Sequence, residues 1–294
     1  MTRARNVADI IKQPFTTTLG TSNYRAGVNA GNSIASGGNY NVVVGDEAGT
    51  ALTTGDNNIA VGYQAGDALD TGSHNVAIGQ AALSDDTKGN KSTAVGREAL
   101  ANQNFTSSTD VFNTAVGYSA GVSVTTGVEN TLIGALAGDA LTTGSQNVSL
   151  GYQALTSDDV GSDSVAIGKG TLQNQNFTTA TNSYNVAVGR DAGNDITTGI
   201  QNTLIGGLAG DALTDADANV AVGRAALTTD TLGSQSVAIG SRALNSQNFT
   251  TATNSYNTAV GADAGLAVST GIENTIIGGL AGDALTDADY NVAL

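Results

Sequence analysis

Large and small apolar residues alternate in a five-residue motif, Asn-x-Ala-[Val/Ile]-Gly, that recurs along most of the chain. Residues 75–79, for example, read NVAIG. Successive side chains of a strand point to opposite faces, so Val76 and Ile78 share one face and Ala77 takes the other. Neither face carries a charge, which is typical of a strand covered on both sides. We expect one face to form a core and the other to contact a second copy of the chain. The alternative is a monomer with an Ala/Thr outer face.

The motif glycines follow a regular spacing. Gly45, Gly62, Gly79 and Gly96 recur with a period of 17, the next step to Gly117 is 21, and this 72-residue block then repeats. A 17-residue unit is too short for a strand–helix–strand crossover, but it accommodates two short strands and two turns. The second strand would be the Ala65-Gly66 or Ala82-Leu83 segment and its equivalents. The sequence therefore predicts an all-β, parallel β-solenoid of about 15 coils, because stacked coils bury what one coil cannot.

Glycine and asparagine occupy fixed places in each coil. The motif glycine ends the first strand, where a left-handed or crowded backbone favours a residue without a side chain. A second glycine closes the other turn, but Ala216 and Ala288 replace it in two coils, so that place does not always need a positive φ. Asparagine opens most motifs, and stacked amides can form a hydrogen-bonded ladder. The predicted ladder residues include Asn58, Asn75, Asn113, Asn147, Asn185, Asn219 and Asn257.

Every fourth coil carries four extra residues, which we place at the turn after the second strand. Insertions in a solenoid lie on one side and often bind ligands, and an aromatic ring beside amide groups suits a sugar. The alternative is that Phe105 covers the edge of the core, with Phe112 packed beneath it. The predicted receptor-binding loops are Gln103, Asn104 and Phe105, then Gln175, Asn176 and Phe177, then Gln247, Asn248 and Phe249.

The composition argues against most kinds of catalytic, metal-binding and nucleic-acid-binding site. The chain has 26 acidic and 11 basic residues, a formal net charge of −15, one histidine and no cysteine. Nucleic acid is therefore not expected as a partner, since phosphate binding needs clustered Lys and Arg. No catalytic residue, cofactor or metal site is predicted, and we expect the protein not to be an enzyme.

Three weaker alternatives come from side chains that recur in the repeat. Asp215 and Asp217 form an Asp-x-Asp pair, as do Asp287 and Asp289, and calcium prefers such carboxylates, but solvated turn residues are the simpler interpretation. Threonine pairs suggest an ice-binding ladder, but the array is interrupted too often. A glycoside hydrolase would need paired carboxylates in a groove, and no acidic pair stands outside the repeat.

The N-terminal segment, residues 1–22, differs from the rest. It holds three of the basic residues and the single proline. We interpret residues 1–22 as an attachment arm and linker and residues 23–294 as the repeat region. The arm would dock on a virion or tail protein through Arg3, Arg5, Ile10 and Ile11. The sequence has neither an export signal nor an apolar run long enough to span a membrane, so no membrane insertion is expected.

The repeat units resemble two groups of fibrous proteins. Their Asn-x-Ala-[Val/Ile]-Gly motif is similar to the head repeats of trimeric autotransporter adhesins, which implies a left-handed β-roll and a homotrimer. Residues 61–66 (VGYQAG) and 150–155 (LGYQAL) look still more like the repeats of bacteriophage tail fibres, including marine and cyanophage fibres. Fibres of that kind commonly end in a trimerising or chaperone domain, so we expect a C-terminal tip beyond Leu294.

These observations predict a structural function. The first hypothesis is a tail fibre or other virion appendage that spaces a host-recognition tip from the particle, located in the virion. The alternative is the head domain of a bacterial surface adhesin that binds host or matrix ligands. A homotrimer and a host-surface glycan are the expected partners.

Overall fold

The computed structural model describes residues 20–294, and the proposed attachment residues Arg3, Arg5, Ile10 and Ile11 lie outside them. The chain divides between Asn113 and Thr114 into two compact units. Each unit is a parallel β-solenoid, and no helix occurs among the described residues. None of these residues accordingly forms a helix that could cross a membrane.

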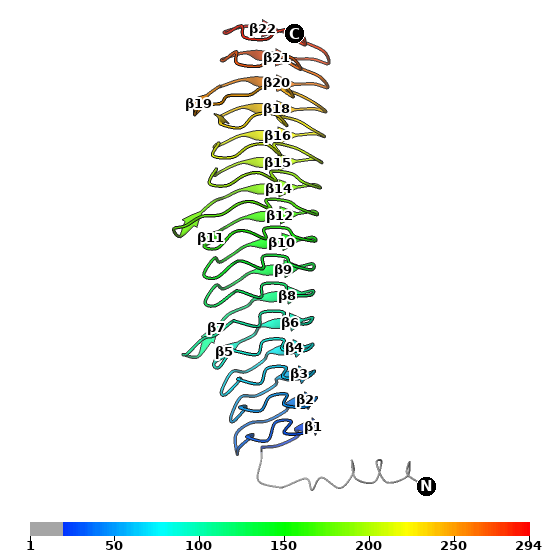
Figure 1. Cartoon of the computed structure of the whole chain (residues 1–294), viewed down its shortest axis with the longest axis vertical. Helices are drawn as coiled ribbons and strands as arrows, with labels where there is room; N and C mark the ends of the chain where they lie inside the picture. The colour runs from blue at the N-terminus through cyan, green and yellow to red at the C-terminus, as the bar shows by residue number, and fades with distance from the viewer. Residues whose placement is uncertain (1–19) are drawn as a thin grey trace, which may run out of the picture. The chain divides into compact units, whose positions relative to one another are not determined.

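The first unit contains five motif strands and one short pair. The motif strands stack in chain order, as Figure 1 shows, and each is hydrogen-bonded in parallel to the next. They are β1 (Tyr24–Ala26), β2 (Val42–Val44), β3 (Ile59–Val61), β4 (Val76–Ile78) and β6 (Thr93–Val95), and the short pair is β5 (Gly89–Asn90) with β7 (Thr109–Asp110).

The second unit continues the pattern with eleven motif strands and two short pairs. The motif strands are β8 (Thr114–Val116), β9 (Thr131–Ile133), β10 (Val148–Leu150), β12 (Val165–Ile167), β14 (Val186–Val188), β15 (Thr203–Ile205), β16 (Val220–Val222), β18 (Val237–Ile239), β20 (Thr258–Val260), β21 (Thr275–Ile277) and β22 (Val292–Ala293). The short pairs are β11 (Gly161–Ser162) with β13 (Thr181–Asn182) and β17 (Gly233–Ser234) with β19 (Thr253–Asn254). With the five of the first unit, the motif strands agree with the predicted solenoid of about 15 coils.

The motif pairs in register from coil to coil. Ala60 lies beside Ala77 across the ordinary step of the repeat, and Ala166 lies beside Ala187 across the longer step. These alanines are fully buried, whereas Ile59 and Ile78 are exposed. The small residue of the motif therefore faces the core, and the larger Val and Ile residues face outward.

The predicted second strand does not form. Gln64 and Gly66 have φ values of 55° and 53°, so the segment that contains Ala65 bends through successive turns. It still bonds to the next coil, since the Gly66 N–H donates to the Ala82 carbonyl at 2.9 Å. A left-handed backbone at two nearby positions is incompatible with an extended strand, and alternating apolar residues alone do not reveal it.

The two glycine positions of the coil favour glycine for different reasons. Gly62 has φ 137°, and a Cβ there would lie 2.6 Å from the Gly79 carbonyl oxygen of the next coil. Gly55 has no positive φ, as the alanine replacements indicated, but its Cβ would lie 2.2 Å from the Gly72 carbonyl oxygen. The first position needs both a special backbone and a close approach, whereas at the second only the close approach favours glycine, and Ala216 and Ala288 occupy it in two coils.

Candidate functional site: the insertion coils

The longer coils that carry the insertions, and the coil before each, rearrange the core. In ordinary coils a glycine such as Gly66 precedes a buried leucine such as Leu69, and a Cβ on Gly66 would lie 2.9 Å from the Leu69 Cδ1. In the coil before each insertion the order is exchanged, because Leu83 takes the glycine position and Asp86 the leucine position. Leu83 is fully buried with φ 52°. One leucine fills the core from either place, and the exchange makes room for a polar side chain.

Buried carboxylates occupy that room. Asp158 is fully buried, and its Oδ1 accepts hydrogen bonds from the N–H groups of Gly161 and Phe177 at 3.1 and 3.3 Å. Its Oδ2 accepts a bond from Gln175 Nε2 at 2.6 Å. A Cβ on Gly161 would lie 2.2 Å from Oδ2, so glycine is required for the carboxylate to fold back over the turn. The same arrangement recurs at Asp86 with Gln103 and at Asp230 with Gln247.

The glutamine also bridges a break in the asparagine ladder. In ordinary coils the Asn75 N–H donates to Asn58 Oδ1 at 3.0 Å, and Asn58 Nδ2 donates to the Gly72 carbonyl at 2.8 Å. Ser164 occupies the asparagine position in the insertion coil and cannot supply an amide. Gln175 instead donates to Ser164 Oγ at 2.8 Å.

The bridge is completed on the far side of the serine. Asn185 Nδ2 donates to Gln175 Oε1 at 2.9 Å, and Asn185 Oδ1 then accepts from the Asn202 N–H at 2.9 Å. The ladder predicted from the sequence is therefore present and is routed through a glutamine in each insertion coil. The asparagines of the predicted ladder are all buried: Asn58, Asn75, Asn113, Asn147, Asn185, Asn219 and Asn257.

The expectation that the whole Gln-Asn-Phe loop lies on the surface is wrong. The glutamines are fully buried in the network above, and the phenylalanines are buried over the turn glycines; a Cβ on Gly233 would lie 2.7 Å from the Phe249 ring. Only the asparagines between them reach solvent. Asn104 and Asn176 are exposed, and Asn248 is half-buried. The buried residues are Gln103, Phe105, Gln175, Phe177, Gln247 and Phe249.

The extra residues form short exposed arms after each buried phenylalanine. In the second arm, residues 178–180 and Asn182 are exposed, and the Tyr184 ring is 54% exposed. Asn182 Nδ2 donates to the Tyr184 hydroxyl at 3.2 Å, and Asn254 makes the same bond to Tyr256 at 3.4 Å in the third arm. These arms present an aromatic ring together with an amide to solvent, whereas the Gln-Asn-Phe segments expose only their asparagines.

The first arm is different. Lys91 Nζ lies 5.1 Å from the centre of the Phe112 ring and 2.6 Å from Asp110 Oδ2. Phe112 is 51% exposed and does not pack beneath Phe105, so that part of the alternative interpretation is wrong. The equivalents of Lys91 are Asp163 and Gln235. The ring is therefore capped by a lysine in the first arm and lacks that cap in the other two.

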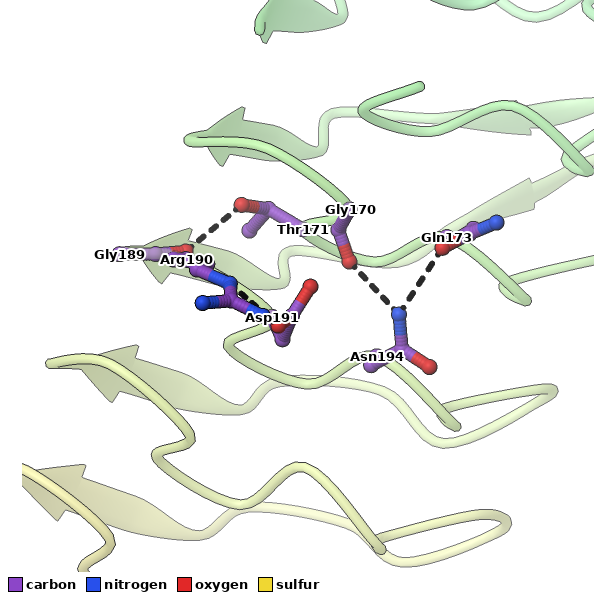
Figure 2. Close-up of polar contacts among 7 residues, drawn as sticks. All are labelled: Gly170, Thr171, Gln173, Gly189, Arg190, Asp191 and Asn194. Atoms are coloured by element: carbon purple, nitrogen blue, oxygen red, sulfur yellow. Dashed lines mark hydrogen bonds and ion pairs between the residues drawn. The ribbon is translucent and has the colours of Figure 1, made fainter. Parts of the chain in front are cut away.

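A side-chain brace ties an insertion coil to the coil after it (Figure 2). Asn194 Nδ2 donates to the Gly170 carbonyl at 2.9 Å and to Gln173 Oε1 at 3.1 Å. The Thr171 hydroxyl donates to the Gly189 carbonyl at 2.8 Å. Neighbouring coils are thus joined by side chains as well as by the backbone, which fixes their register.

Burial shifts the pKa of several carboxyl groups. It raises the pKa of Asp158 above its ordinary value, and it also raises the pKa of Asp67, Asp139 and Asp211. The hydroxyls of Thr156 and Thr228 donate to Asp139 and Asp211, which partly offsets the effect of burial. Neighbouring carboxylates raise the pKa further at three of these groups: Asp85 and Glu47 act on Asp67, Asp195 and Asp191 act on Asp211, and Asp159 acts on Asp158.

The carboxylates of the Asp-x-Asp pairs accept hydrogen bonds at the turns. Asp217 Oδ1 accepts from the Ile200 N–H at 2.8 Å, and Asp215 Oδ1 accepts from the Thr198 hydroxyl at 2.7 Å. Within residues 20–294, no three acidic or histidine side chains gather as a metal ion would require. Comparisons with protein families, with curated proteins and with solved structures gave no match to this chain.

Proposed function

We propose that the chain is a structural segment of a homotrimeric fibre, namely a bacteriophage tail fibre or a related virion appendage. The observation that carries this proposal is the outer face of the motif strands. In every coil this face presents two side chains, most often Val or Thr followed by Val, Ile or Leu, and they are half-buried or exposed. Ile205, Ile239 and Ile277 are among the most exposed of these, at 40%, 37% and 45%.

The area of this face supports association. In the second unit, eleven strands at a spacing of about 4.8 Å form a strip of Val, Ile, Leu and Thr side chains roughly 50 Å long and about 10 Å wide. Soluble monomers rarely expose a continuous apolar patch larger than a few hundred Å². No charged side chain interrupts the strip in the second unit, so a second copy of the chain is the occupant that its repeat favours.

The repeat itself supports a mechanical function. Each coil is bonded to the next by backbone and by the asparagine ladder, and three buried Asp-Gln pairs join the insertion coils to the coils before them. Such contacts between nearest neighbours stabilise a stack of repeats. The exposed arms with Tyr184 and Tyr256 are the surface that a host glycan would contact, because an aromatic ring and a neighbouring amide suit a sugar. The N-terminal segment, residues 1–22, would attach the fibre to the particle.

Solution mass tests the association. The chain has a mass of 29.1 kDa, and light scattering is expected to give three times that value. Ile205→Lys together with Ile239→Lys should shift the protein toward the monomer, whereas Thr251→Lys, on an exposed arm, should not. A wild-type protein of monomer mass would overturn the proposal.

The bacterial adhesin is the second candidate, since its head repeats share the same motif. Mass spectrometry of purified phage particles separates the two. Peptides of this chain in the particles support the virion appendage, and their presence in a bacterial surface fraction alone supports the adhesin. Deletion of residues 1–22 should abolish incorporation into particles while leaving the repeat region folded.

A further inference from the structure

The three exposed arms of the insertion coils are not equivalent. The second and third arms, residues 175–185 and 247–257, share the sequence QNFTTATNSYN, whereas the first arm, residues 103–113, reads QNFTSSTDVFN. In the second unit, the loops beside β11 and β19 reach out beyond the turns of the neighbouring coils (Figure 1). The second and third arms therefore present two copies of one surface.

Backbone pairing and a side-chain bond hold these two arms in place. In the second arm, β13 pairs in parallel with β11 of the preceding coil, and Asn182 Nδ2 donates to the Tyr184 hydroxyl at 3.2 Å. In the third arm, β19 pairs with β17, and Asn254 makes the equivalent bond to Tyr256. Because each hydroxyl is anchored while its ring stays 54% exposed, the ring and the amide are ordered before a ligand arrives.

The first arm differs in the group beside its ring. The Lys91 ammonium lies 5.1 Å from the centre of the Phe112 ring, a cation–π contact, and is held by Asp110 at 2.6 Å. A ligand on this ring would have to displace the lysine from its ion pair. Asp163 and Gln235 stand at the Lys91 position before the second and third arms, and neither side chain is a cation.

The charges around the second and third arms favour an uncharged ligand. Neither arm contains a charged side chain, since an asparagine replaces Asp110 in both. The adjacent coils supply acids: Asp163 precedes the second arm, and Glu273 follows the third, where its N–H donates to the Ser255 carbonyl at 2.7 Å. An anionic ligand would meet these carboxylates without a Lys or Arg in the arm to offset them.

The exposed groups of these arms suit a sugar ring. The C–H groups on the face of a pyranose carry a small positive charge and pack against the negative face of an aromatic ring. Amide and hydroxyl groups both donate to and accept from sugar hydroxyls. Besides its ring and amide, each arm exposes two threonines, namely Thr178 and Thr179 in the second arm and Thr250 and Thr251 in the third.

We infer that the second and third arms are two identical binding sites for an uncharged saccharide and that the first arm is not a site of this kind. This inference rests on the proposed function, in which the arms contact a host glycan. Strands β14 and β20, which follow the two arms, are four steps apart in the sheet, so the sites repeat about 19 Å apart along the second unit. A polysaccharide that reaches both sites binds more tightly than a short saccharide that reaches one.

Binding of the full chain to immobilised polysaccharides tests the assignment. The probes are uncharged polymers of glucose, galactose, mannose and rhamnose, with alginate as the acidic probe and chitosan as the amine-bearing probe. At least one uncharged polymer should bind more tightly than both charged probes. Tyr184→Ser together with Tyr256→Ser should weaken that binding about tenfold or more, because both sites lose their ring. The matched control, Phe112→Ser in the first arm, should leave it unchanged.

Conversion of the first arm tests the role of its lysine. Lys91→Gln, Asp110→Asn and Phe112→Tyr give this arm the side chains that the third arm has at the same places. Added to the protein that lacks Tyr184 and Tyr256, the three changes should restore binding to the same uncharged polymer. Circular dichroism of each variant verifies the fold, which these exposed positions should not alter.

Several results would overturn the inference. The uncharged polymers could all fail to bind, alginate or chitosan could bind more tightly, or binding could survive the loss of both tyrosines. A converted first arm that does not restore binding would show that an exposed ring and amide do not make the site. Each of these results leaves the proposed association standing, whereas a wild-type protein of monomer mass would remove the proposed function itself.

Discussion

Gln175 donates a hydrogen bond from Nε2 to Oδ2 of Asp158 at 2.6 Å, and both side chains are fully buried. The pair lies in two neighbouring coils and recurs with the 72-residue block. A stack of near-identical coils is liable to slip by one coil, since the apolar core looks the same at each level. A buried carboxylate that needs one particular amide opposes such a slip, in the way that a buried polar residue sets the register of a coiled coil.

Removing that amide should be costly. We expect Gln175→Met to reduce the free energy of unfolding by about 2–4 kcal/mol, because it leaves Asp158 and Asn185 with unmet hydrogen bonds in the core. The neighbouring Asn176→Ala changes an exposed side chain and should stay within about 0.5 kcal/mol of the wild type. Urea unfolding followed by circular dichroism measures both. Equal stabilities of the two variants would show that the network does not stabilise the fold.

Two adjacent glycines should respond differently to the same substitution. Gly206 has φ 137°, and its Cβ would lie 2.5 Å from the Gly223 carbonyl oxygen, whereas a Cβ on Gly207 meets only the Arg190 carbonyl oxygen at 3.9 Å. We expect Gly206→Ala to cost about 2 kcal/mol or more and Gly207→Ala to be nearly neutral. Thermal unfolding of the two variants provides the comparison, and a neutral Gly206→Ala would contradict the tight stacking of the motif glycines.

The exchange of leucine and glycine predicts a coupling between Gly66 and Leu69. Gly66→Leu should overfill the core, and Leu69→Ala should leave a cavity that costs several kcal/mol. The double variant should be more stable than the sum of the two costs implies, by about 1 kcal/mol or more, because the new leucine enters the vacated space. A double-mutant cycle measured by urea unfolding checks this, and additive costs would mean that the two positions do not share one volume.

The raised carboxyl pKa values predict a stability that increases in acid. For Asp139 the folded pKa lies above the ordinary 3.8, so between the two values the folded state binds more protons than the unfolded state. This contribution is complete below 3.8 and is lost as pH rises through the folded pKa. Asp139→Asn should therefore reduce the gain in unfolding free energy between pH 7 and pH 4. Urea titrations at several pH values test this, and an unchanged pH profile in the variant would contradict it.

The sequence predicted where the insertion coils lie along the chain, but it did not predict which of their side chains are exposed. The extra residues and their 72-residue spacing were visible, but the sequence left Phe105 open between a surface loop and the edge of the core and predicted Gln103 only as a loop residue. What decided between them was Ser92, which replaces the ladder asparagine and receives a bond from Gln103 Nε2 at 2.9 Å. The replacement of asparagine by serine, together with Asp86 at a leucine position, was the signal that could have located the buried network.

The spacing of the motif by itself determined the parallel solenoid, because such short units with a recurring hydrogen-bonding side chain can satisfy their backbone only by stacking in register. It did not determine which strand face is the core, since Ala77 and Ile78 are both apolar. The tertiary structure assigned the alanine to the interior, where it packs with Leu69 and its equivalents, and the same position holds the buried Leu132, Leu204 and Ile276 in other coils. The tertiary structure also decided that the predicted second strand, the segment around Ala65, forms turns. The left-handed backbone at Gln64 depends on close stacking and not on any pattern of apolar residues.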